Sequence, residues 1–198
     1  MASFINLDSI WRDREMYPNP SDYQLTPTQV ESWFRSARTI RAFPANPSTQ
    51  PLDFSMSVNI KHLILPYDDR IVELPRVYMD FHSRRYNDIH LIQTIDGRHP
   101  DARFICIPHK VQNDINGNPL WIHYTCNMEQ VMRFKRDDMM IFKLTTRDGS
   151  TLPNFDTLPP DSPDPNKQTL VAFEVTPYLR DSDYGAGDNA MIQPAGVS

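Results

Sequence analysis

The six histidines are the side chains of this 198-residue chain best suited to hold a metal ion or to move a proton. Metal sites need such ligands at close spacing, as in His-x-His or His-Glu-x-x-His, and cysteine ligands usually come as Cys-x-x-Cys. None of these patterns occurs in the sequence, whose histidines are His62, His82, His90, His99, His109 and His123. The sequence therefore predicts no metal and no other cofactor.

Motifs for nucleophilic catalysis are also absent. The chain has no Gly-x-Ser-x-Gly and no P-loop, and neither Cys106 nor Cys126 has the features of an activated thiolate. Asp114, Asn116 and Asn118 imitate the start of a calcium loop, but Pro119 and the lack of a closing Glu favour a plain hairpin turn. We therefore expect a protein that is not an enzyme and that acts by binding other proteins.

Charge and hydropathy exclude further classes of partner. The formal net charge of −5 gives no general attraction to phosphate backbones, so no nucleic-acid partner is expected. No apolar run approaches the roughly 20 residues of a transmembrane helix, and the first residues do not form a signal peptide. Synthesis in the cytoplasm is expected, with Cys106 and Cys126 as buried free thiols and a disulfide as the alternative.

Apolar and polar residues alternate from about residue 52 to residue 180, which is typical of strands with one buried face. The pattern predicts about seven or eight strands, an all-β fold, and a single antiparallel jelly-roll sandwich over residues 51–180. An immunoglobulin-like sandwich is the alternative. The side chains expected inside are Phe54, Val58, Val77, Met79, Phe81, Ile122, Phe142, Leu144 and Phe173.

One short helix is predicted at about residues 27–39. Thr26 can cap it, Pro27 suits its first turn, and Gln29 completes a capping box with Thr26. Its packing face has the i, i+3, i+4, i+7 spacing of an amphipathic helix and consists of Val30, Trp33, Phe34 and Ala37.

The segments on either side of the sandwich have a different composition. Residues 1–25 have neither a helical nor a strand period, and Pro18 and Pro20 favour extended backbone. We therefore expect residues 1–50 to form an extended arm that carries the helix, and residues 181–198 to form a carboxyl-terminal tail. Because such an arm adds little to a separate core, its deletion is expected to leave the melting temperature almost unchanged. The loop at residues 150–166 holds five prolines and cannot be a central strand.

The arm is the predicted partner-binding site. Arg12 and Arg14 can form bidentate pairs with carboxylates, and tyrosines supply large, rigid contact areas. The residues assigned to this site are Arg12, Asp13, Arg14, Tyr17, Pro18, Asn19, Pro20 and Tyr23.

The same arm resembles the amino-terminal signature of minor capsid proteins of nucleocytoplasmic large DNA viruses, chlorella-type viruses in particular. The residues that carry the resemblance are Phe4-Ile5-Asn6-Leu7-Asp8-Ser9, Arg12-Asp13-Arg14 and Tyr17-Pro18-Asn19-Pro20-Ser21-Asp22-Tyr23. The carboxyl-terminal part is also similar, through residues 142–149, Gln168 and residues 173–176.

This resemblance implies a structural minor capsid protein that binds and cements capsomers of the major capsid protein in an icosahedral virion shell. Its expected place is the inner side of the shell, its expected partners are those capsomers and other minor capsid proteins, and a homo-oligomer is left open. The alternative is a non-catalytic carbohydrate-binding module, for which Trp121 and Tyr78 are the candidate aromatic pair.

Overall fold

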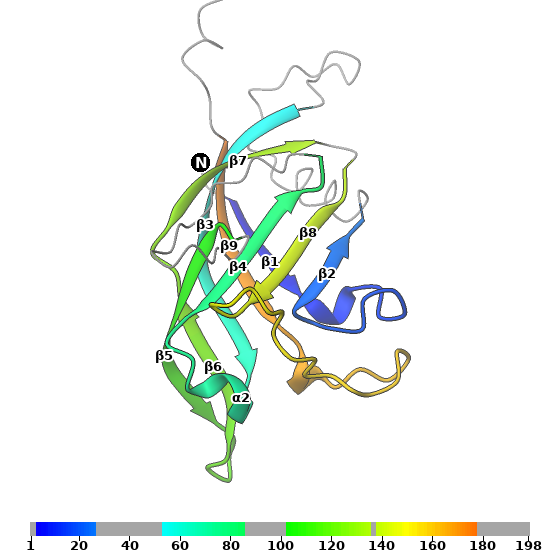
Figure 1. Ribbon diagram of the computed structural model, residues 1–198, viewed down its shortest axis with the longest axis vertical. Helices are drawn as coiled ribbons and strands as arrows, with labels where there is room; N and C mark the ends of the chain where they lie inside the picture. Colours follow the sequence, from blue (N-terminus) through cyan, green and yellow to red (C-terminus); the bar gives the residue numbers. More distant parts are fainter. Residues whose placement is uncertain (1–2, 27–52, 86–101, 136–137, 178–198) are drawn as a thin grey trace, which may run out of the picture.

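Strands make up most of the regular structure in the computed structural model, which describes residues 3–26, 53–85, 102–135 and 138–177 (Figure 1). They are β1 (Ser3–Asp8), β2 (Asp22–Leu25), β3 (Asp53–Pro66), β4 (Val77–Ser83), β5 (Phe104–Asn113), β6 (Pro119–Thr125), β7 (Glu129–Lys135), β8 (Met140–Thr145) and β9 (Leu170–Pro177). The described helices are short, namely α2 (Asp69–Val72) and the 3₁₀ turns η1 (Ser9–Trp11) and η2 (Pro165–Lys167). The prediction of an all-β fold is confirmed.

The strands form one curled antiparallel sheet (Figure 1). Its order is β1-β9-β3-β6-β5-β4-β8-β2, and β7 pairs with β3 beside this path. Strand β5 joins two parts of the sheet, one with β1, β9, β3 and β6 and the other with β4, β8 and β2. Its first residues pair with β4 and its later residues pair with β6.

The core fills the inside of the curl. The ring of Phe81 on β4 stacks on that of Phe173 on β9 with centroids 4.7 Å apart, and it lies 6.4 Å from that of Phe134 on β7. The two parts of the sheet therefore face each other across a shared apolar interior. Eight of the nine predicted core side chains are at most 4% exposed, namely Val58, Val77, Met79, Phe81, Ile122, Phe142, Leu144 and Phe173.

A bulge in β3 explains how this long strand contributes buried side chains to the core along its length. Its pairing with β9 shifts between Ile60 and His62. Ile60 and Leu63 are both buried although they are three positions apart, because the extra residue restores the inward direction of the side chains that follow. The strand can therefore bend with the sheet while it keeps one face in the core.

The predicted hairpin turn after β5 is also confirmed. Oδ1 of Asp114 accepts hydrogen bonds from the backbone N–H groups of Asn116 and Asn118, each at 2.8 Å. Gly117 has φ 85°, a conformation that glycine adopts without a steric cost. Figure 1 shows this hairpin projecting at the lower end of the molecule.

The prediction that residues 1–25 form an arm without regular structure is wrong. Strand β1 pairs with β9 from Ser3 to Asp8, and β2 pairs with β8 from Asp22 to Leu25. Pro18 and Pro20 lie in the connection between these strands, so they interrupt neither ladder. Because β1 and β2 are the first and last strands of the sheet order, this short segment supplies both of its ends.

Several other predictions fall on parts of the chain that the structure does not describe. These are the helix at about 27–39 with its face Val30, Trp33, Phe34 and Ala37, the tail at 181–198, and the side chain of Phe54.

Candidate functional site

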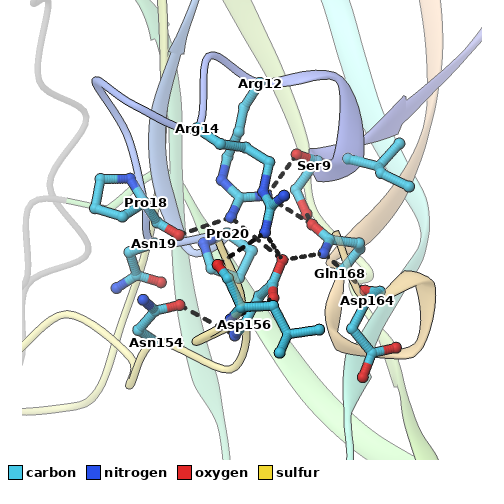
Figure 2. A network of polar contacts seen from close by, with 12 residues as sticks. Ser9, Arg12, Arg14, Pro18, Asn19, Pro20, Asn154, Asp156, Asp164 and Gln168 are labelled. Atoms are coloured by element: carbon cyan, nitrogen blue, oxygen red, sulfur yellow. Dashed lines mark hydrogen bonds and ion pairs between the residues drawn. The ribbon is translucent and has the colours of Figure 1, made fainter. Parts of the chain in front are cut away.

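Seven of the eight predicted binding residues lie on the connection between β1 and β2, and the eighth, Tyr23, lies on β2 itself. The connection starts at η1, which Asp8 caps by accepting a hydrogen bond from the N–H of Ile10 at 2.9 Å. An α-turn follows, in which the N–H of Tyr17 donates to the carbonyl of Asp13 at 2.8 Å. The chain thus folds back on itself between the two edges of the sheet, and this turn brings Arg12 and Arg14 next to each other (Figure 2).

Arg12 closes this loop from the inside. Its guanidinium donates to the carbonyls of Ser9 at 2.7 Å, Tyr17 at 2.8 Å and Pro18 at 2.6 Å. A further bond from Nη1 reaches Oε1 of Gln168 at 2.6 Å. The side chain is fully buried, so four acceptors compensate for the loss of its hydration.

Arg14 makes the corresponding contacts with the long loop before β9. Its Nη2 lies 2.7 Å from Oδ2 of Asp156, and its Nη1 donates to the carbonyls of Pro159 at 2.9 Å and Pro160 at 2.6 Å. A weaker contact of 3.3 Å joins Nη2 to the carbonyl of Leu158. The proline-rich loop is therefore held against the amino-terminal segment by its own backbone oxygens.

Asp156 and Gln168 connect the two arginines. Nε2 of Gln168 donates to Oδ2 of Asp156 at 2.7 Å, while Nη2 of Arg12 lies 3.9 Å from the same oxygen. The pKa of Arg12 lies below its usual value because of burial and then the charge of Arg14, although Asp156 opposes this shift. An arginine nevertheless stays charged in proteins, so two cations share one buried carboxylate. Backbone carbonyls stabilise the remaining positive charge.

Smaller polar groups extend the network to the start of β9. Ser9 donates through Oγ to Oε1 of Gln168 at 3.0 Å and accepts from the N–H of Thr169 at 2.8 Å. Oγ1 of Thr169 donates to the carbonyl of Pro20 at 2.7 Å. Nδ2 of Asn19 donates to the carbonyl of Leu152 at 2.9 Å. The segment between β1 and β2 is thus fastened at both ends and in the middle.

The structure divides the eight predicted binding residues between the interior and the surface. Arg12, Arg14, Pro20 and Tyr23 are buried, Tyr17 and Asn19 are half-buried, and Asp13 and Pro18 are exposed. The arginines were expected to reach a partner protein, but their terminal nitrogens donate hydrogen bonds to acceptors within this protein. Tyr23 is also part of the core, with its ring centroid 4.8 Å from that of Phe142, and burial raises the pKa of its hydroxyl.

The sequence analysis did not identify the role of Asp156, which lies in the proline-rich loop at residues 150–166. Asp156 is 3% exposed and lies 142 positions from Arg14 along the chain. A carboxylate in a loop rich in proline and aspartate gives no local sign of burial, because its partners are distant in sequence.

Exposed apolar side chains lie on the segments that the network joins. Trp11 is 76% exposed, Met16 69% and Leu158 50%. Trp11 is next to Arg12 in the sequence, and the carbonyl of Leu158 accepts the hydrogen bond from Arg14. We call these three residues the network surface.

A cavity beside Arg14, Pro18 and Leu158 has a volume of about 130 Å³, below the range of sites that enclose a drug-sized ligand.

The aromatic pair proposed for carbohydrate binding is not formed. Tyr78 is 1% exposed and lies on β4, whose side chains are all buried, whereas Trp121 lies on β6 and is partly exposed. These two rings cannot form one exposed platform.

Two other kinds of site are not found among the described residues. No group of three or more His, Cys, Asp or Glu side chains within residues 3–26, 53–85, 102–135 and 138–177 is arranged to hold a metal ion. None of the helices in these ranges has the length and apolar character needed to cross a membrane.

Comparison with models of known protein families finds no match to this chain, and comparison with curated protein sequences finds none either.

Proposed function

We propose that this protein is a structural minor capsid protein of a large DNA virus, which binds and cements neighbouring capsid proteins in the virion shell. The observation that carries the proposal is the contact between the two distant parts of the sequence signature. Ser9 and Arg12, from the amino-terminal part, both bind Oε1 of Gln168, from the carboxyl-terminal part. One network therefore joins signature residues from both parts of the sequence, which supports a shared fold with the viral proteins that they resemble.

The finer fold proposed here is a jelly roll. The pairing is nested, with β1 on β9, β2 on β8, β3 on β6 and β4 on β5. Such nesting is expected when one long antiparallel ribbon is wound on itself, which is how the two Greek keys of a jelly roll arise. This pattern supports the proposal, although β5 and β6 also join the two halves into one sheet.

The proposed contact with neighbours is the network surface of Trp11, Met16 and Leu158. Trp and Met are enriched at the centres of protein interfaces, and exposed side chains on rigid loops lose little entropy when a partner binds. The buried arginines contribute indirectly, because they fix both loops that carry these side chains. The proposed partners are capsomers of the major capsid protein and other minor capsid proteins, at the inner side of the shell.

Mass spectrometry of purified virions tests this function. The protein should stay in particles after washes with high salt and detergent, in a fixed ratio to the major capsid protein. Carbodiimide crosslinking should then join the exposed carboxylates of Asp13 and Glu15, which lie between Trp11 and Met16 in the sequence, to lysines of other capsid proteins. Loss of the protein from washed particles would show that it is not part of the shell.

A further inference from the structure

Two cysteines outside the network lie opposite each other, Cys106 on β5 and Cys126 directly after the end of β6. Ile107 on β5 pairs with Thr125 on β6, so the next antiparallel position brings Cys106 opposite Cys126. A hydrogen bond joins the two thiols. Residues that face each other in an antiparallel pair have Cα atoms about 4.5 or 5.5 Å apart, within the range that a disulfide spans.

The two thiols differ in their environment. Cys106 is fully buried, whereas Cys126 keeps 6% exposure. The pKa of Cys126 lies below its ordinary value because Cys106 donates a hydrogen bond to its sulfur, and the N–H groups of Met128 and Ile105 add to this effect against desolvation. The pKa of Cys106 lies well above its ordinary value, because of the same hydrogen bond and then burial. Cys126 is thus the better nucleophile, with Cys106 positioned to react second.

We propose that Cys106 and Cys126 form a latent disulfide that closes when the protein meets a small peroxide such as hydrogen peroxide. The thiolate of Cys126 attacks one peroxide oxygen, the O–O bond breaks, and the departing hydroxide takes up a proton to leave as water. The thiol of Cys106 then attacks the sulfur of the resulting sulfenic acid, and its proton leaves with the hydroxyl as a second water. Two thiols are oxidised and one peroxide is reduced.

The position of this bond gives it a structural effect. Cys106 also pairs with Val77 of β4, so the bond lies where β5 passes from β6 to β4. The disulfide therefore fixes the junction between the two parts of the curled sheet. It also limits the freedom of the unfolded chain, and for a loop of this length in a chain of this size we expect the melting temperature to rise by roughly 6–12 °C.

Peptide mapping of the full chain tests the proposal without any mutation. The protein is treated with hydrogen peroxide, alkylated while denatured, and digested with trypsin under non-reducing conditions. Trypsin separates the two cysteines into peptides 104–110 and 111–133. We expect these peptides to be joined after peroxide, to separate when dithiothreitol is added, and to be joined only in samples with the higher melting temperature.

Two single variants assign the order of the steps. Cys106→Ser should trap a sulfenic acid at Cys126 that reacts with dimedone, whereas Cys126→Ser should leave Cys106 unmodified. Alkylation of both cysteines after peroxide treatment of the native protein, or their oxidation to sulfinic acid without a link, would overturn the proposal even if neither variant folds.

Discussion

Nη1 of Arg12 lies 2.6 Å from Oε1 of Gln168, and this single buried hydrogen bond joins residues 156 positions apart. The bond belongs to a network that fastens the connection between the two edge strands to the loop that precedes β9. The arginines of the amino-terminal segment therefore stabilise the protein from the inside, and only the residues around them face outward.

Replacing Arg12 by alanine should lower the free energy of unfolding by about 3 kcal/mol or more, because it leaves buried carbonyls and Gln168 without their donor. Arg12→Lys should recover only part of the loss, since an ammonium cannot reproduce the guanidinium fork. The matched control is Arg70→Ala. Arg70 lies 2.5 Å from Asp68, but its side chain is 61% exposed, so the expected loss is about 1 kcal/mol or less. Urea titration measures the free energy of unfolding of all three variants. Equal losses for Arg12→Ala and Arg70→Ala would contradict a stabilising role for the buried network.

Deleting residues 1–25 should abolish cooperative folding, which reverses the expectation from the sequence alone. The deletion removes Leu7, Tyr23 and Leu25 from the core and leaves β9 and β8 as new, unprotected edges. Exposed edges pair with other chains, so the truncated protein should aggregate. Size-exclusion chromatography and near-UV circular dichroism would detect both effects.

Two substitutions in β1 test whether this strand stabilises the protein through its buried side chain. Leu7→Ala should cost about 2–5 kcal/mol, because Leu7 is 4% exposed. Phe4→Ala, on the same strand but 68% exposed, should change stability by about 0.5 kcal/mol or less. A monomeric truncation with an unchanged melting temperature would restore the view of residues 1–25 as an independent arm.

The double substitution Trp11→Ala with Met16→Ala should leave the fold intact and lower incorporation into virions by roughly tenfold or more, because exposed aromatic anchors dominate interface energies. Ile115→Ala is the control, since Ile115 is fully exposed at the tip of the β5–β6 hairpin. Quantitative mass spectrometry of purified particles gives the copy number. Wild-type incorporation of the double variant would remove the network surface from the proposed interface.

Acid should destabilise the protein partly through Asp138. Burial alone would raise the pKa of this carboxyl, but hydrogen bonds from Ser83 and from the N–H groups of Arg85 and Met139 bring it below its ordinary value of 3.8. A carboxyl with a depressed pKa contributes stability above its unfolded pKa, and this contribution is lost as the pH falls through the folded pKa. Urea titrations from pH 7 to pH 3 should show a smaller acid-induced loss for Asp138→Asn. An unchanged pH dependence would mean that Asp138 does not contribute.

The sequence predicted the strands with long alternation and most of the core, because a period of two reports directly which face is buried. It did not predict β1 and β2. In β2, Tyr23 and Leu25 alternate with polar neighbours, but a strand of four residues gives too short a pattern. The sequence identified Arg12 and Arg14 as residues that bind carboxylates. It did not predict that their side chains point into the protein. Their orientation depends on Asp156 and Gln168, and only the folded chain brings these four side chains together.

The pairing of β1 with β9 has a consequence for how the protein is made. Ser3 lies opposite Val175, so β1 leaves the ribosome long before β9, the strand with which its ladder must form. Nested, long-range pairing of this kind slows folding, because much chain must be ordered before the distant contacts form. We expect the two ladders that β9 forms with β1 and β3 to close only after residue 175 has emerged. Until then β1 is an unpaired strand, and crowding of nascent chains during rapid synthesis would favour mispairing between copies.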